Sequence, residues 1–379
     1  MSQLDFLLSV PTMGRIVDKF PSLTKPGPFT SLFQMGGIEK APGGRYYYEK
    51  ITNDRRLAAI RDYEAAGFVS PKPTRRFVDQ GMIVVAEKEI ITPKELFMIA
   101  APGMPLVANA GEVIARAVLR GFARLHRTRE YFCARLLQDA SGVSISPSAT
   151  AWLTGATQVT ETVNIDGSLQ TYAVAAGWDV ETTRLISGDT QLADAQRTYE
   201  GNGFVAEHLI YSRDTAKAIV GNIEAQTWLS HNGLQSMEFY RANLAASARL
   251  QGEGADLLAA NALSGIGDVP KHVTLEHHYT NGSGTVTRYM DDGKVIMLPG
   301  KDRLQEVLGF VEGPVFVPRN NNVIGAEAAA EFFDVKLGMQ AYAMRSDDDV
   351  PTITICFRDA FVPVVRNENG VLCLTGVTS

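Results

Sequence analysis

The sequence has few cysteines and no long apolar run. Cysteine occupies three of the 379 positions, Cys133, Cys356 and Cys373. So sparse and odd a count argues against a disulfide framework and indicates a reducing compartment with buried structural thiols. No stretch of about 18 consecutive apolar residues is present, so no membrane-spanning helix is expected. The short apolar run at the N-terminus has Asp5 at its start and no basic residue before it, which is unlike a signal peptide.

The chain also lacks the short motifs of the common enzyme classes. It contains no G-x-x-x-x-G-K-[ST], H-E-x-x-H, G-x-S-x-G or C-x-x-C pattern. The G-x-G fragments at 252–254 and 265–267 have no third glycine and no preceding strand, which favours a flexible loop. Neighbouring strand residues point to opposite faces, so Glu276, His277 and His278 offer at most two ligands to one ion. We therefore predict no catalytic residue, no metal site and no cofactor.

The composition is that of a folded chain, but its charge is uneven. Hydrophobic residues make up 45% and charged residues 21%, with a net charge of −6. Residues 1–140 carry 20 Lys and Arg against 14 Asp and Glu, whereas residues 141–379 carry 16 against 28. This asymmetry indicates either ordinary surface composition or an N-terminal part that meets an anion or the acidic half of another copy.

The N-terminal quarter of the chain does not look like a domain core. Residues 1–44 show no sustained period and predict an extended arm. Residues 40–90 are charged and β-prone, and so long a polar excursion is rare in a compact monomer unless something covers it.

Two helices are predicted after this excursion. The TPKE sequence at 92–95 has the form of a capping box, in which Thr92 and Glu95 satisfy each other's backbone N–H groups. A long helix is then predicted over 109–139, with Asn109 as its cap. Its apolar face is formed by residues at helical spacing, Ile114, Val118, Phe122, Leu125, Phe132 and Leu136.

A second stripe on the long helix is basic. Arg116, Arg120, Arg124 and Arg127 follow one another at steps of four, four and three. The stripe is either a solvated or salt-bridged face, or a wall that faces a polyanion.

Strands and helices alternate in the remainder. A hairpin is predicted over 157–175, a helix over 187–200, a strand over 204–211 and a helix capped by Ser212 that ends near Leu229. A further helix is predicted over 234–250. Strands are then expected at 273–279, 285–290, 294–298, 338–345, 352–359 and 371–374, and Pro363 is expected to separate the last two.

Several stretches, in this order, resemble the lambda-type major capsid proteins of tailed phages, the major capsid protein E family. They are ITPKELF at 91–97, the long helix ending in LLQD at 136–139, GTVTRY at 284–289 with DGKVIMLP at 292–299, and PTITICFRDAF at 351–361 followed by VPV. No single stretch is a catalytic signature, but the four in this order are fairly specific, and the resemblance covers most of the chain. The 45–90 region matches the family only in general character.

The resemblance implies an α+β chain with the Hong Kong 97 fold. On that pattern residues 1–39 are an N-terminal arm and 40–90 an extended β loop that lies across a neighbouring subunit. The resemblance therefore implies that the basic residues of the loop contact other subunits: Arg45, Arg55, Arg56, Arg61, Lys72, Arg75 and Arg76. Residues 91–185 form a peripheral domain with the long spine helix, 186–335 an axial domain, and 336–379 C-terminal strands that return to the peripheral domain.

The function implied is that of a major capsid protein that self-assembles into an icosahedral shell around the double-stranded DNA of a tailed phage or prophage. The expected partners are further copies as hexamers and pentamers, scaffold and portal proteins, a decoration protein and packaged DNA, with no membrane. The expected location is the virion capsid, assembled in the host cytoplasm. The arginine stripe would face the DNA.

Three alternatives stay open at this point. An encapsulin-like compartment shell would share the fold and enclose enzymes. A soluble two-domain enzyme would use the 252–267 loop with His272, His277 or His278. A minor virion component, such as a decoration or tail protein, would differ in copy number per particle.

Overall fold

The structure is a computed structural model. It describes residues 26–51, 75–92, 94–95, 106–145, 163–167, 169–180, 183–184, 191–224, 271–281, 284–318, 333–346 and 352–378. Within these ranges, none of the helices is both long enough and apolar enough to cross a lipid bilayer.

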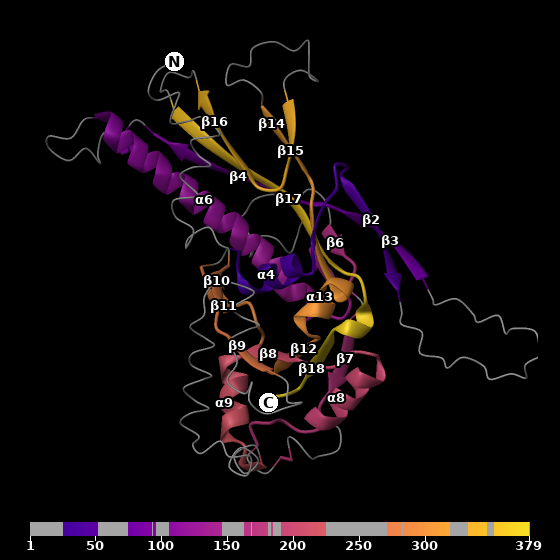
Figure 1. The fold of residues 1–379 in the computed structure, drawn as a ribbon. Coiled ribbons are helices and arrows are strands. Elements are labelled where there is room, and N and C mark those ends of the chain that lie inside the picture. Colours follow the sequence, from indigo (N-terminus) through magenta and orange to yellow (C-terminus); the bar gives the residue numbers. More distant parts are fainter. Residues whose placement is uncertain are drawn as a thin grey trace, which may run out of the picture.

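A long helix and a five-stranded sheet form one end of the molecule (Figure 1). The helix is α6 (Leu106–Leu136). The strands run in the order β1-β13-β17-β16, and β4 also pairs with β17. Their bounds are Ile38–Lys40 for β1, Ile83–Ile91 for β4, Leu308–Glu312 for β13, Gln340–Ser346 for β16 and Thr352–Val365 for β17.

A second five-stranded sheet lies beyond the C-terminal end of α6, at the bottom of Figure 1. Its order is β7-β18-β12-β8-β9, and helices α8 and α9 lie beside it. The strands are β7 (Gln170–Ala173), β8 (His208–Ser212), β9 (Lys271–Leu275), β12 (Lys294–Leu298) and β18 (Leu372–Thr375). The helices are α8 (Leu192–Gly201) and α9 (Arg213–Gly221).

Strand pairs and short helices complete the described fold. The antiparallel pairs are β2 (Arg45–Ile51) with β3 (Arg75–Gly81), β5 (Val143–Ile145) with β6 (Val163–Ile165), β10 (His278–Thr280) with β11 (Val286–Arg288), and β14 (Pro314–Pro318) with β15 (Phe333–Leu337). The short helices are α4 (Pro28–Met35), α13 (Lys301–Val307) and the 3-10 turn η1 (Glu368–Gly370).

The apolar face of α6 confirms the predicted helical pattern. Ile114, Val118, Leu125, Phe132 and Leu136 are all buried. Ile114, Val118 and Leu125 share an apolar cluster with Ile353, Ile355 and Phe357 of β17, and the Phe132 ring contacts that of Phe361. These strand residues are an even number of positions apart, so they lie on one face of β17. The opposite face of β17 is covered by β14, so β17 lies between two apolar layers. Asn109 lies inside α6, which begins at Leu106, and so does not cap it as expected.

The other two predicted side-chain caps, at Thr92 and Ser212, are present. Thr92 and Glu95 form the reciprocal capping box, since the Thr92 N–H donates to the Glu95 carboxylate at 2.8 Å and the Glu95 N–H donates to the Thr92 hydroxyl at 3.4 Å. Ser212 caps α9 by accepting a hydrogen bond from the Thr215 N–H. However, α9 ends at Gly221, short of the expected Leu229. Asn222 is extended there, and its buried side chain donates to the carbonyl of Thr183.

The hairpin predicted over 157–175 is wrong. Strand β6 pairs with β5, and β7 pairs in parallel with β18. Asp166 and Gly167 do not form the expected hairpin turn. Asp166 instead bonds Lys50, and Gly167 lies so close to Gly142 that a Cβ on either residue would overlap the backbone. Tertiary contacts therefore override the local turn signal.

The prediction that Pro363 separates two strands is also wrong, because β17 continues through it to Val365. Proline lacks a backbone N–H and is tolerated where one side of a strand is unpaired. Among the described strands, β13 alone pairs with β17 at Pro363, since the pairing with β4 ends at Phe361 and that with β16 at Arg358.

The predicted arm, residues 1–39, is described only from residue 26. Its described part lies in the core, where Phe29, Leu32 and Phe33 of α4 are fully buried and β1 pairs in parallel with β13. The helix predicted over 187–200 is confirmed from Leu192 onward as α8, and residues 187–190 lie outside the described residues. The helix predicted over 234–250 and the loop at 252–267 lie wholly outside them. The division of the chain into five segments remains a prediction.

The close contact of α6 with β17 gives a first testable prediction. A Cβ at Gly121 would lie 2.3 Å from the ring of the buried Phe357. We expect Gly121→Ala to destabilise the fold, because overpacking costs about 1–3 kcal/mol and outweighs the helix-propensity gain of about 1 kcal/mol. The matched control is Gly201→Ala, at the end of α8, where a Cβ meets nothing within 4 Å. The free energy of unfolding in urea measures both, and equal effects would contradict the packing argument.

Candidate functional site

The arginine stripe lies on the exposed face of α6, and three of its four members form ion pairs. Arg116 pairs with Glu112 one turn earlier on α6. Arg120 pairs with Glu89, and Arg124 pairs with Glu87, both on the neighbouring strand β4. The salt-bridged interpretation of the stripe is therefore present in the structure.

The periodicities of helix and strand produce the two pairs with β4. Arg120 and Arg124 are four residues apart on α6, which is about 6 Å along the helix axis. Glu87 and Glu89 are two residues apart on β4, so they share a face and are separated by about 6.8 Å. The spacing of the two carboxylates on β4 therefore matches the spacing of the two arginines on α6.

Arg127, the last member of the stripe, is exposed. Within the part of the chain that the structure describes, no carboxylate lies within ion-pair distance of its side chain. Exposed ion pairs contribute only about 0–1 kcal/mol to stability. The stripe is therefore a surface feature that the fold does not require.

The basic residues predicted to contact other subunits fall partly on the β2–β3 hairpin. Arg45 forms an exposed ion pair with Asp79 across the hairpin at 2.8 Å, and Arg76 lies 4.0 Å from Asp166. Arg75 begins β3. The other members of the set lie outside the described residues: Arg55, Arg56, Arg61 and Lys72.

The two faces of the β2–β3 hairpin differ in character. The inner face is fastened to the body, since the buried Lys50 donates to Asp166 and to the Gly167 carbonyl at 2.8 and 2.7 Å. The outer face carries Tyr47 and Phe77, which are 69% and 80% exposed. Tyr47 pairs with Asp79 in the register, so the two rings are diagonal neighbours on one face. The hairpin projects from the body in Figure 1.

Sequence reasoning missed the buried charge cluster beneath α6. Arg129 donates two hydrogen bonds of 2.6 Å to Asp359 on β17 and lies 3.4 Å from Glu312 on β13. Its side chain is 4% exposed and that of Asp359 is fully buried. The rings of Phe310 and Phe361 lie 5.0 and 5.4 Å from its guanidinium carbon. A signal was present, because Arg129 falls in the apolar stripe between Leu125 and Phe132.

The next residue, Glu130, holds α4 against α6. Its buried carboxylate accepts hydrogen bonds of 2.8 Å from the Phe29 N–H, the Thr30 N–H and the Thr30 hydroxyl, in the first turn of α4. No cation of the described residues forms an ion pair with it. Burial raises the pKa of Glu130 to about 7, although the bonds from Thr30 and Phe29 oppose the shift.

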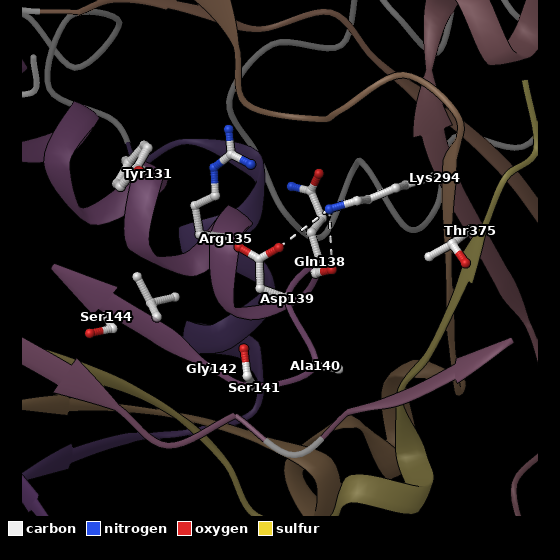
Figure 2. A pocket seen from close by; sticks show the side chains of 11 residues that line it. Tyr131, Arg135, Gln138, Asp139, Ala140, Ser141, Gly142, Ser144, Lys294 and Thr375 are labelled. Carbon is white, nitrogen blue, oxygen red and sulfur yellow. Dashed lines mark hydrogen bonds and ion pairs between the residues drawn. The ribbon is translucent and has the colours of Figure 1, made fainter. Parts of the chain in front are cut away.

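The C-terminal end of α6 borders a cleft of about 570 Å³ that contains a second charge cluster (Figure 2). Lys294 of β12 lies 3.3 Å from Asp139 and 3.1 Å from Asp291, and Arg135 lies 2.8 Å from Asp291. The buried Gln138 amide accepts from the Asp291 N–H and donates to the Tyr289 carbonyl. These contacts fasten the helix end to the turn before β12.

No group of three metal-ligating side chains occurs among the described residues. His277 is half-buried, and burial lowers its pKa, with His278 adding to the shift. The three cysteines are free and buried, which confirms the predicted structural thiols. Burial raises the pKa of the Cys133 thiol well above its usual range.

Comparisons with known proteins agree with this architecture. The model of the phage major capsid protein E family matches residues 30–311. A prophage protein of E. coli CFT073, assigned as its capsid protein, is similar over 97% of this chain and 99% of that chain, at 12% identity and a TM-score of 0.58. No curated protein matches the chain in sequence.

Two further solved structures are similar at lower TM-scores. The capsid of a native GTA particle is similar over 92% of this chain and 90% of that chain, at 12% identity and a TM-score of 0.46. Mycobacterium phage Che8 is similar over 94% and 93%, at 12% identity and a TM-score of 0.41.

The fold is therefore the Hong Kong 97-type capsid fold. The chain belongs to the phage major capsid protein E family, because the family model covers most of its length. Its class is that of the structural subunits of a tailed-phage or prophage capsid, as the sequence resemblance predicted.

The buried pair under α6 gives the second prediction. Arg129→Met leaves the buried Asp359 without its partner, and we expect a loss of about 3–5 kcal/mol in the free energy of unfolding. The double variant Arg129→Met with Asp359→Leu should recover much of this loss. Arg197→Met, which breaks the exposed pair with Asp194, is the control and should cost less than about 1 kcal/mol. Similar losses of unfolding free energy from Arg129→Met and Arg197→Met would contradict the conclusion that the buried pair stabilises the fold more than the exposed one.

Glu130 gives the third prediction. A carboxyl whose pKa is raised on folding stabilises the folded state below its unfolded pKa and loses that contribution as pH rises through its folded value. Because burial raises the pKa of Glu130 from 4.5 to about 7, we expect the wild type to lose stability between pH 4.5 and 7, by up to about 3 kcal/mol. Glu130→Gln should remove this pH dependence in urea titrations at a series of pH values. An unchanged slope would show that Glu130 is not its source.

Proposed function

We propose that the chain assembles with copies of itself into a closed icosahedral shell that encloses double-stranded DNA. Membership of a capsid-protein family supports this proposal. So does the β2–β3 hairpin, which carries the proposal because its outer face has two exposed aromatic side chains and no cover within the described chain.

The contact made by this hairpin is heterologous in the proposal. An exposed aromatic face on a projecting hairpin is covered by a different surface of the next subunit, and such head-to-tail contacts generate rings when the rotation closes. The basic N-terminal part and the acidic remainder of the chain favour the same arrangement. Arg45, Arg75 and Arg76 lie on this hairpin, so it presents positive charge as well as aromatic area.

The wider assembly also belongs to the proposal. Hexamers and pentamers of the chain would form the shell, with scaffold and portal proteins during assembly and a decoration protein outside. Assembly would take place in the host cytoplasm. The exposed face of α6, with Arg116, Arg120, Arg124 and Arg127, would face the packaged DNA and attract its phosphates without sequence preference.

Electron microscopy of the purified protein tests this function and gives the fourth prediction. At low and moderate salt, and with a scaffold partner supplied where needed, the wild type should form closed shells, hexamers or pentamers. Tyr47→Ser with Phe77→Ser should abolish or strongly reduce these assemblies. Its free energy of unfolding should change by less than about 0.5 kcal/mol, because both side chains are exposed.

The matched control is Val205→Ser with Val286→Ser, which removes two exposed apolar side chains elsewhere on the surface. This control should assemble normally. A wild type that stays monomeric with a scaffold partner present would refute the shell proposal. Normal assembly of the hairpin variant would refute the role of the hairpin and leave the shell proposal standing.

A further inference from the structure

The ion pairs of the arginine stripe have an arrangement that differs from an ordinary salt-bridged helix face. The carboxylates that pair with Arg120 and Arg124 come from β4 and lie deeper than the guanidinium groups. The Arg120 side chain is 58% exposed against 16% for Glu89, and that of Arg124 is 48% exposed against 29% for Glu87. An approaching phosphate would therefore meet the guanidinium groups first.

The Glu89 carboxylate is also held in place beside Arg120. One of its carboxylate oxygens pairs with Arg120, and the other is buried without a hydrogen-bond partner among the described residues. A half-buried carboxylate that gives up hydrogen bonds with water needs a nearby cation. The Arg120–Glu89 pair is therefore a fixed part of the surface.

We propose that Glu87 and Glu89 limit the affinity of the α6 arginines for DNA. This inference rests on the proposed DNA-facing role of α6 and specifies how strongly that face would bind. The partner it concerns is the phosphate backbone of double-stranded DNA.

Counting charge shows how the limit would work. The four arginines of the stripe face three carboxylates, those of Glu112, Glu87 and Glu89, so the group carries a net charge of about +1. At physiological salt the Debye length is about 8 Å, which exceeds the spacing of successive pairs. A phosphate therefore responds to the summed charge of neighbouring pairs.

Because the carboxylates lie deeper than the guanidinium groups, they reduce the long-range attraction of DNA but do not block short hydrogen bonds to phosphate. Each guanidinium has five N–H donors, so Arg120 and Arg124 retain donors for a phosphate while they stay paired. The carboxylates beneath them cancel most of the longer-range attraction. Short contacts with phosphate remain available on such a surface, but strong accumulation of DNA on it is disfavoured. Arg127, exposed and without a carboxylate among the described residues, supplies the remaining positive charge.

Salt-dependent DNA binding by the unassembled full-length subunit tests the inference and is the fifth prediction. The probe is a fluorescent 30-base-pair duplex, and the slope of log K against log salt concentration is measured by anisotropy. Glu87→Gln with Glu89→Gln should bind more tightly than the wild type at low salt. Its slope should be steeper by up to about 2, because two guanidinium groups become free to displace counterions.

Controls separate this effect from net charge and from misfolding. Asp194→Asn with Glu306→Asn removes two carboxylates from exposed ion pairs with Arg197 and Arg303, away from α6, and should leave the slope unchanged. If the β4 variant does not fold, Glu112→Gln removes an exposed carboxylate from α6 itself and should steepen the slope by up to about 1.

One further double variant distinguishes the inference from the proposed function. Arg116→Gln with Arg127→Gln should weaken binding if α6 faces DNA. If that variant weakens binding but the β4 variant binds like the wild type, the limiting role of Glu87 and Glu89 is wrong and the DNA-facing role stands. If neither variant changes binding, both are wrong.

Discussion

The buried ion pair between Arg129 and Asp359 is the constraint on which the rest of the fold depends. It joins the C-terminal third of α6 to the middle of β17, and Glu312 extends it to β13. A fully buried carboxylate without its cation would cost several kcal/mol, so α6 cannot slide or rotate relative to the sheet without breaking the pair. The adjacent Glu130 then fixes α4 against α6 by accepting hydrogen bonds from the first turn of α4.

The position of β4 follows from the same constraint. Strand β4 pairs with β17 from Ile353 to Phe361, and Asp359 lies within this stretch. Once Arg129 fixes α6 over Asp359, the register of β4 places Glu87 and Glu89 beside Arg124 and Arg120. A shift of β4 by one residue would turn both carboxylates to the opposite face. The surface ion pairs are thus a consequence of the buried one.

Sequence reasoning succeeded where the signal was local or strongly periodic. The strand at 294–298, the two side-chain caps and the apolar face of α6 follow from alternation, cap chemistry and helical spacing. It failed where distant partners decide the outcome. The Asp166-Gly167 turn is overridden by Lys50 and Gly142, and Pro363 stays in a strand because β13 supplies its pairing on one side. For the candidate site, helical spacing in the sequence predicted the arginine stripe. Its pairing with Glu87 and Glu89 could not be predicted, because it depends on where the fold places β4.

Buried and exposed arginines therefore have different roles on one helix. Arg129 is held by two hydrogen bonds in an apolar environment, where loss of one partner is costly. Arg120 and Arg124 form exposed pairs with β4, and each retains N–H donors that can contact phosphate while the pair stays intact. In the proposed shell, the buried charges would set where the inner face of each subunit lies, and the exposed charges would set how strongly it attracts DNA. Both sets of arginines lie on α6, but only the buried set holds the helix on the sheet. Substitutions among the exposed pairs could therefore change the attraction for DNA while the position of α6 is retained.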